Sequence, residues 1–422
     1  MDFLQKLKLV WHDASLRKRL FFIGAMLIVF RLLSAIPIPG VDILKLESFL
    51  AENQFFGLLN IFSGGGLSNL SIVMLGVGPY ITASIIMQLL TMMSPKLKEM
   101  YQEEGEAGRA KFAQYSRLLS VPLALIQAFG FLVLLSRSGV LSELALFSTI
   151  TNVIIVTAGS LLVMWIGEMM TEYGIGNGTS LIIFAGIVSG LPSVVAQLAF
   201  TFDPSQVPVY LGFLALALLV VWGVVVVTEA ERPIPVTYAK RVRGMKVYGG
   251  VSTYLPLRIN QAGVIPIIFA LSILLFPQMI ATVFSAFDNA ILHSISTFLT
   301  TVFSNSWVYA GLYFVLVFLF TYFYTAVTFD PETISTNLQK NGAFIPGVRP
   351  GESTSQYIAS VVTRITLVGA TFLAVVAILP LAMKGLTGNQ SLAIGGTALL
   401  IVVSVVLDLI KKIDAQISMR EY

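Results

Sequence analysis

The sequence predicts an all-α, polytopic membrane protein. Of its 422 residues, 56% are hydrophobic and only 11% are charged, and the mean hydropathy is +0.86. A soluble domain carries about 25% charged residues. The apolar residues are also grouped, because about ten separate stretches reach the roughly 20 residues that a helix needs to cross a bilayer. Basic residues fall unevenly between these stretches, which is typical of membrane topology.

The predicted spans follow one another along the whole chain. They lie near residues 20–37, 72–93, 115–135, 151–170, 180–199, 209–229, 260–284, 307–328, 358–380 and 391–410. Residues 1–200 then hold five spans, and residues 201–422 hold the other five. An odd number in each gives the two halves opposite orientations, which is typical of proteins with a pathway between their halves. We therefore predict two domains that correspond to these halves.

Lysine and arginine set the predicted orientation. When the connections are assigned alternately to two sides, nearly all basic residues fall on the side with both termini and the connections 94–114, 171–179, 230–259 and 329–357. The other side holds only Lys45, Arg137 and Lys384. Basic residues concentrate in cytoplasmic connections, so we expect both termini to be cytoplasmic.

The stretch from Gly57 to Met93 is apolar but interrupted, first by three glycines at 64–66 and then by Gly76, Gly78 and Pro79. Glycine costs about 1 kcal/mol in a helix interior and proline about 3 kcal/mol. Non-helical backbone in hydrocarbon survives only against protein or a water-filled cavity. Two interpretations remain open: a broken segment beside a cavity in the bilayer, and an ordinary span preceded by a glycine-rich outer loop.

The connections 230–259 and 329–357 are unusually long and combine basic residues with glycine, proline and tyrosine. Long connections in compact proteins are usually functional or disordered. We favour docking surfaces, because setting the topology needs only a few charges. The alternative is a solvated linker whose lysines and arginines only orient the chain.

The chain carries no recognisable chemistry of its own. It has no cysteine and only two histidines, and it lacks a phosphate-binding GxxxxGK[ST] loop, so we expect no catalytic residue, no metal site and no cofactor. Ionisable residues are rare within the spans; for Arg31 in the first span and Glu168 near the end of the fourth we expect structural roles. A secondary transporter for a small solute would normally place a carboxylate at the midplane. A membrane-embedded hydrolase is a further alternative, and it would lose its activity when a single nucleophile is replaced.

Several runs resemble the SecY family of protein-conducting channels. The most specific are FRLLSAIPIPG at 30–40, SIVMLGVGPYITASIIMQLL at 71–90, MWIGEMMTEYGIGNGTSLIIFAGIVSGLP at 164–192 and NLQKNGAFIPGVRPGESTSQYI at 337–358. Matches of this kind cover most of the chain. The resemblance implies ten transmembrane helices in two pseudo-symmetric inverted halves, a central hourglass pore and a short re-entrant plug helix over residues 57–70.

The resemblance also implies site residues. The pore ring falls on Val77, Ile81, Ile183, Ile187, Ile268 and Ile401, where Val77 replaces the isoleucine of many members. The plug carries Asn60, Phe62, Gly64, Gly65, Gly66 and Leu67. A lateral gate between the second and seventh spans has the polar candidates Thr82, Ser84, Gln88 and Asn260. For Gln88, a buried interhelical hydrogen bond without a gating role stays open.

The partners follow from the same resemblance. The SecA motor ATPase or the ribosome, through its RNA, would dock on Lys240, Arg241, Arg243, Lys246 and Arg349. SecE-like and SecG-like subunits would complete the complex. Secretory precursors and their signal sequences would pass through the pore or leave sideways into membrane lipid, so the expected location is the bacterial inner membrane, with an external source of energy.

Overall fold

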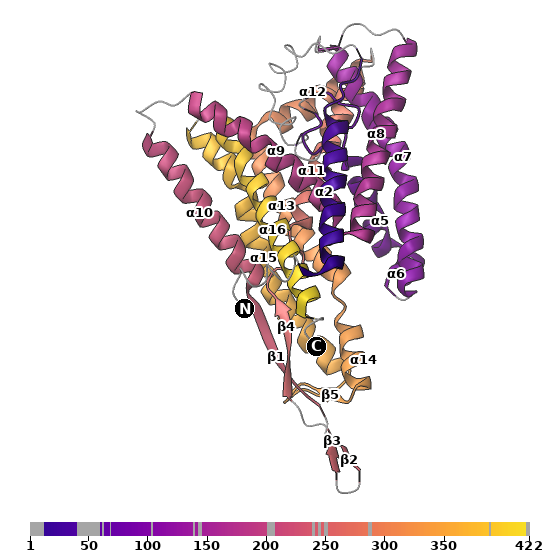
Figure 1. Cartoon of the computed structure of the whole chain (residues 1–422), viewed down its shortest axis with the longest axis vertical. Helices are drawn as coiled ribbons and strands as arrows, with labels where there is room; N and C mark the ends of the chain where they lie inside the picture. The colour runs from indigo at the N-terminus through magenta and orange to yellow at the C-terminus, as the bar shows by residue number, and fades with distance from the viewer. Residues whose placement is uncertain are drawn as a thin grey trace.

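The computed structural model describes residues 12–39, 60, 63–67, 69–102, 104–137, 140–141, 146–200, 207–238, 241–243, 246–248, 252–285, 289–387 and 390–418. Helices dominate these residues, and a small group of strands projects from one end of the helical body (Figure 1). Five helices in the described part are long and apolar enough to cross a membrane.

Each predicted span coincides with a helix. These helices are α2 (Ala14–Ser34), α5 (Gly78–Met93), α7 (Gly105–Arg137), α8 (Leu146–Tyr173), α9 (Gly178–Phe200), α10 (Val207–Glu229), α11 (Ile265–Ser285), α13 (Ser306–Thr328), α15 (Glu352–Thr387) and α16 (Gln390–Ser418). The first five precede residue 201. They contact the second five where α11 packs against α5 and α7, and where α16 packs against α9.

Local sequence explains where several helices begin. The Asp13 carboxylate caps α2 by accepting the backbone N–H of Ser15 at 2.8 Å, and such a cap contributes about 1 kcal/mol. Pro79 lies in the first turn of α5, where proline is tolerated because its missing N–H would have no helical partner. The predicted start of this span at residue 72 is therefore wrong, since residues 72–77 form turns and the helix begins at Gly78.

Three shorter helices were not predicted: α6 (Pro95–Gln102), α12 (Ala290–Ser304) and α14 (Pro331–Lys340). The side chain of Asp330 caps α14 by accepting the N–H of Glu332 at 3.0 Å and the hydroxyl of Thr333 at 2.7 Å. Burial by itself would raise the pKa of Asp330. These hydrogen bonds and the charge of Lys98 outweigh burial, so the pKa of Asp330 lies below its ordinary value.

The connection 230–259 is a β-hairpin rather than an irregular loop. Strands β1 (Glu231–Tyr238) and β4 (Ser252–Arg258) pair antiparallel with Ile234 opposite Leu255, and β5 (Ala343–Phe344) pairs with the far end of β1. Beyond them, β2 (Arg241–Arg243) and β3 (Lys246–Tyr248) form a second small hairpin at the tip (Figure 1).

The two long connections fold together into one structure, which we call the sheet unit: β1 to β5, α14 and the first turns of α15. Its apolar core combines Ile234, Val236 and Leu257 from the hairpin with Ile345 from the second connection and Ile358 from α15. The sequence predicted docking surfaces in these two connections but not that they share one core, which packs on α15.

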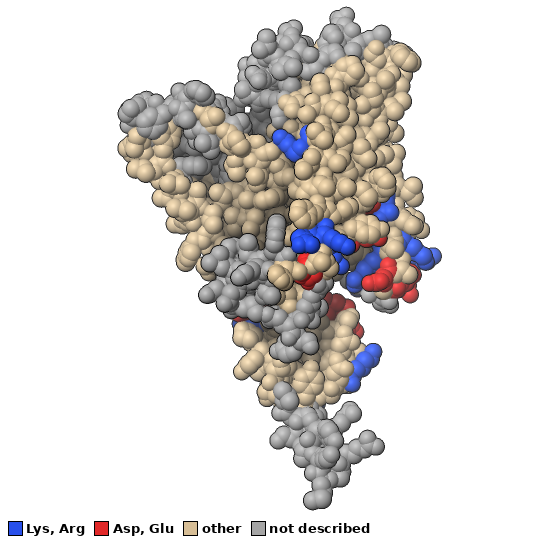
Figure 2. Space-filling view, in the orientation of Figure 1, with Lys and Arg blue, Asp and Glu red and all other residues tan. Residues whose placement is uncertain are grey.

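Charged side chains gather at the end of the molecule that carries the sheet unit. On the face shown in Figure 2, most of the charged side chains lie at mid-height or below, and the surface above them is mainly tan apart from one basic residue. Glu168, within the predicted fourth span, pairs with Arg117 of α7 at 2.6 Å. This ion pair agrees with the structural role expected for Glu168.

Replacement of Ile358 by alanine should loosen the sheet unit. Ile358 is fully buried beneath both connections, and removal of a buried isoleucine side chain costs about 2–5 kcal/mol. We expect faster hydrogen exchange at the amides of β1 and β4, measured by mass spectrometry on the purified full chain. The exposed Ser360→Ala on the same helix is the control, and equal exchange in both variants would contradict a shared core.

Candidate functional site

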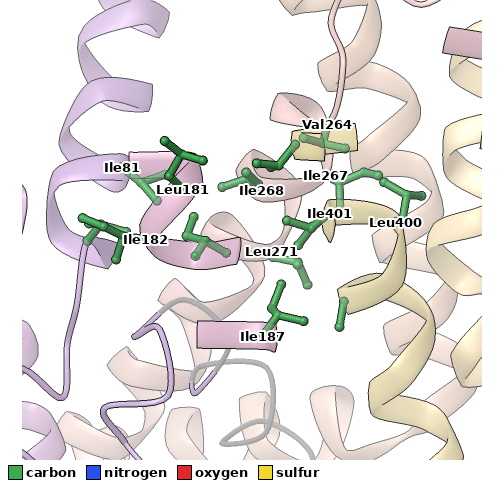
Figure 3. Packing of buried hydrophobic residues seen from close by; sticks show 14 of the residues in the cluster. Ile81, Leu181, Ile182, Ile187, Val264, Ile267, Ile268, Leu271, Leu400 and Ile401 are labelled. Carbon is green, nitrogen blue, oxygen red and sulfur yellow. The ribbon is translucent and has the colours of Figure 1, made fainter. Parts of the chain in front are cut away.

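An aliphatic cluster occupies the centre of the helical body. All six residues predicted for the ring are buried, each at most 9% exposed, and all belong to one hydrophobic cluster: Val77, Ile81, Ile183, Ile187, Ile268 and Ile401. Figure 3 shows Ile81, Ile187, Ile268 and Ile401 converging from separate helices on one small region. The structure therefore brings together residues that lie more than 300 positions apart in the sequence.

These side chains come from both halves of the chain. Val77 and Ile81 lie at the start of α5, and Ile183 and Ile187 lie one turn apart on α9. From the second half, α11 contributes Ile268 and α16 contributes Ile401. The cluster includes further residues that sequence reasoning did not single out: Leu181, Ile182, Val264, Ile267, Leu271 and Leu400.

The chemistry of this cluster is limited to excluding water. Aliphatic side chains neither donate nor accept protons and bind no metal ion, but closely packed apolar walls dewet a passage. Within the described residues, no group of three or more histidine, aspartate or glutamate side chains could hold a metal ion. The centre can thus act as a seal whose contacts are non-directional.

Beside the cluster lies the glycine segment, which we define as residues 60 and 63–67. The carbonyl of Asn60 accepts the N–H of Gly65 at 2.9 Å and the hydroxyl of Ser63 at 2.9 Å, and Gly64 has a φ of +66°. This pattern is a helix C-terminus closed by a left-handed glycine. Phe62 and residues 57–59, 61 and 68 of the predicted plug lie outside the described residues.

The glycine segment is seated directly on α9. A Cβ atom added at Gly186 would lie 2.1 Å from the Cα of Gly64, and one added at Gly64 would meet the ring of Phe30 at 2.5 Å. Only glycine at both positions allows this approach. Because Gly186 lies between Ile183 and Ile187, the segment rests against the same turn of α9 that contributes to the cluster. Sequence reasoning missed Gly186, although small residues four apart, as at 186 and 190, favour close packing in membranes.

Residues 69–77 continue the chain as turns, and most of their side chains are buried. The N–H of Ile72 donates to the carbonyl of Ile36 at 2.9 Å, and the N–H of Ile38 donates to the carbonyl of Leu70 at 2.9 Å. The hydroxyl of Ser160 on α8 donates to the carbonyl of Gly76 at 2.8 Å. Protein groups thus pair with this broken backbone, as a broken segment inside the protein requires.

Helix α5 packs against α11, and the polar residues predicted for a gate lie on α5 or just before α11. On α5, Thr82 donates its hydroxyl to the carbonyl of Gly78 at 3.0 Å, and Ser84 and Gln88 are partly buried. Asn260 precedes α11 and donates its amide to the carbonyl of Gly263 at 3.2 Å. The amide oxygens of Gln88 and Asn260 are buried without a hydrogen-bond partner among the described residues. A buried unpaired acceptor costs about 1–3 kcal/mol, so these two amide oxygens do not stabilise the packing around them.

Four of the basic residues predicted for docking lie on the sheet unit or in the turn beside it. Arg349 is exposed in a turn between Gly347 and Gly351, and its carbonyl accepts the hydroxyl of Thr354 at 2.8 Å. In the tip hairpin, Arg243 of β2 and Lys246 of β3 occupy opposite register positions, and Arg241 lies at the start of β2. Lys240 lies outside the described residues.

Comparisons with known proteins found matches that cover most of the chain. Residues 71–410 match the family model described as SecY. A relative from Corynebacterium glutamicum, "Protein translocase subunit SecY", is 43% identical and the alignment covers 98% of this chain and 97% of the relative. A solved structure in which the plug domain of SecY is described as stabilising the closed state of the translocation channel has a TM-score of 0.64 at 20% identity, covering 94% of this chain and 91% of its own. Sec61 in a canine ribosome–channel complex has a TM-score of 0.58 at 16% identity, with the same coverage.

The seat of the glycine segment can be tested with Gly186→Val. The added side chain would collide with the backbone of Gly64 and displace the segment from α9. We expect the amides of Gly65 and Leu67 to exchange roughly tenfold faster or more, since a loss of about 1.4 kcal/mol in local stability changes an open population tenfold. Gly190→Ala is the control, because a Cβ at Gly190 meets nothing within 4 Å. Unchanged exchange in Gly186→Val would show that the glycine segment does not rest on Gly186.

Proposed function

The chain belongs to the SecY family, and we propose that it forms a protein-conducting channel through which unfolded polypeptides cross a bacterial cytoplasmic membrane. Its family membership and its helical, SecY-like fold confirm the resemblance read from the sequence. The observation that carries the proposal is the central cluster, in which aliphatic side chains from both halves meet.

In this proposal, the six cluster residues named above form the pore ring. Their contacts are apolar and non-directional, so they can part around any polypeptide sequence and close again behind it. Each fully buried isoleucine contributes about 1.5–3 kcal/mol, which is enough to keep the closed state dominant without locking it. A ring of aliphatic side chains blocks ions by excluding water from the constriction.

The glycine segment acts as the end of the plug. Its seat against Gly186 and Phe30, next to the ring, supports this role, because a plug must cover the constriction at rest. The contact is between backbones with few side-chain atoms, and so it can be broken when a polypeptide enters. In the related structure described above, the plug domain is likewise associated with the closed state.

The seam between α5 and α11 is proposed as the lateral gate, with Thr82, Ser84, Gln88 and Asn260 along it. Interhelical polar contacts in membranes contribute only about 0.6–2 kcal/mol each, and two of the amide oxygens here have no partner among the described residues. Such a seam can part to let a signal sequence or an apolar segment pass into lipid.

The sheet unit is proposed as the docking surface for an external motor, SecA, or for the ribosome. The basic residues Lys240, Arg241, Arg243, Lys246 and Arg349 would attract an acidic protein surface or RNA phosphates, and phosphate contacts would make binding strongly salt-dependent. A structural neighbour of this chain is described in a ribosome–channel complex.

SecE-like and SecG-like subunits would complete the assembly, and both termini would lie on the docking side, in the cytoplasm.

The ring is tested by Ile81→Gly combined with Ile268→Gly. Loss of two buried side chains should raise the resting ion conductance in planar bilayers by about tenfold or more, given about 1.5–3 kcal/mol for each. The control combines Leu90→Gly and Leu312→Gly, which place glycine in helices at exposed positions. Equal conductance in the two double variants would refute the ring.

The docking surface is tested by Arg349→Glu. Reversal of this exposed charge should weaken motor binding by about tenfold to a hundredfold, because a hydrogen bond to a charged group contributes about 1.5–3 kcal/mol. Motor-driven translocation of a secretory precursor into inverted vesicles should fall, while membrane insertion stays normal. Lys340→Glu, an exposed reversal on α14 of the same unit, is the control. Normal translocation in Arg349→Glu would exclude this docking role.

A further inference from the structure

Helix α12 is short and lies at the end of the helical body opposite the sheet unit (Figure 1). It has 15 residues, fewer than the roughly 20 that a spanning helix needs. It packs on α11, and the hydroxyl of Ser296 donates to the carbonyl of Ala281 near the end of α11 at 2.7 Å. Its length and packing place it at the end of α11 rather than across a membrane.

The side chains of α12 divide into three faces at helical spacing. One face packs inward, with Ser296 buried and Phe303 against the central cluster. The second face is apolar and open, with Ile291 71% exposed, Ile295 40% and Phe298 67%. The third face is polar and consists of His293, Ser294, Thr297 and Thr301. A helix with an open apolar face beside a polar one is the pattern of interfacial helices.

The open apolar face leads into the apolar surface of α13. Asn305 ends α12 and caps α13 by accepting the N–H of Trp307 at 3.0 Å. Trp307 is 76% exposed, and an exposed apolar stripe then runs down α13 through Val308, Leu312, Val315 and Leu319. This helix is apolar enough to cross a membrane, and tryptophan is enriched at the membrane–water boundary. The chain thus passes directly from α12 into a helix whose exposed apolar stripe suits contact with lipid.

The polar face of α12 is neutral and largely satisfied. The helix carries no lysine, arginine, aspartate or glutamate. The hydroxyls of Ser294, Thr297 and Thr301 donate to carbonyls one turn earlier, at 2.8 to 2.9 Å. Such a face can lie among lipid headgroups without a charged partner. Attraction to the membrane must then come from apolar burial rather than from anionic lipids.

We propose that α12 lies in the headgroup–acyl boundary of the leaflet opposite the sheet unit, with Ile291, Ile295 and Phe298 inserted into lipid. In this position it anchors the adjoining end of α11. A movement of α11 would then have to drag an inserted helix through the plane of the leaflet. The inference depends on membrane embedding alone, and not on the channel function.

The test uses single nitroxide labels, because the chain has no cysteine of its own. Ile295→Cys and Phe298→Cys report on the open apolar face, and Thr297→Cys and Thr301→Cys are matched controls on the polar face. The labelled full chain is reconstituted in phosphatidylcholine vesicles at high lipid-to-protein ratio. We expect oxygen to collide with the labels at 295 and 298 more often than a water-soluble nickel chelate does, and the reverse at 297 and 301.

Several results would overturn the proposal. Free access of the nickel chelate at 295 and 298 would mean that this face lies in water. Shielding from both oxygen and nickel would mean that a second copy or another protein covers it. A membrane pattern that arises only after phosphatidylglycerol is added would contradict insertion by apolar burial.

Discussion

Backbone groups that leave a helix inside hydrocarbon must find partners within the protein, and the turns between residues 66 and 77 show how this chain meets that requirement. Ile36 and Ile38, just after α2, pair with Ile72 and Leu70, and the hydroxyl of Ser160 on α8 reaches the carbonyl of Gly76. These partners allow the chain to stay non-helical until Gly78. The late start of α5 in turn places Val77 and Ile81 in the central cluster rather than along a longer helix.

The residues before and after Gly66 are held by different kinds of contact. Leu67, Leu70 and Met74 are buried in a second cluster with α7 and α8, so the chain beyond residue 66 belongs firmly to the first half. The glycines before it touch α9 mainly through backbone atoms. Contacts of that kind bury little apolar area and therefore contribute little free energy. The proposed role at the end of a plug, which seals at rest and withdraws when a polypeptide enters, needs this combination.

Composition and hydropathy were enough to predict the ten helical segments and the membrane class, because a span is defined by a long run of apolar residues. Hydropathy missed α12, which is too short to qualify, and α14, whose signal is the cap Asp330–Pro331 rather than apolarity. The hairpin was also missed, although Ile234 and Val236 alternate with exposed residues, because three prolines obscure the strand pattern. No local pattern could have identified the six cluster residues among so many aliphatics, so they came from family resemblance. The contact between Gly64 and Gly186 needed the tertiary structure.

The hairpin joins α10 to α11, and two interactions hold its first and last residues together. The N–H of Ile259 donates to the carbonyl of Ala230 at 3.0 Å, and Arg258 pairs with Glu231 at 3.3 Å. An exposed ion pair contributes only about 0–1 kcal/mol, so the strand pairing and the apolar core beneath it stabilise the hairpin. Pro233 and Pro256 face each other and lack N–H donors, so neither strand can donate a ladder hydrogen bond at this register, and β5 already pairs with the far end of β1. If a partner docks on this unit as proposed, any displacement that it imposes on the hairpin reaches α10 and α11 together.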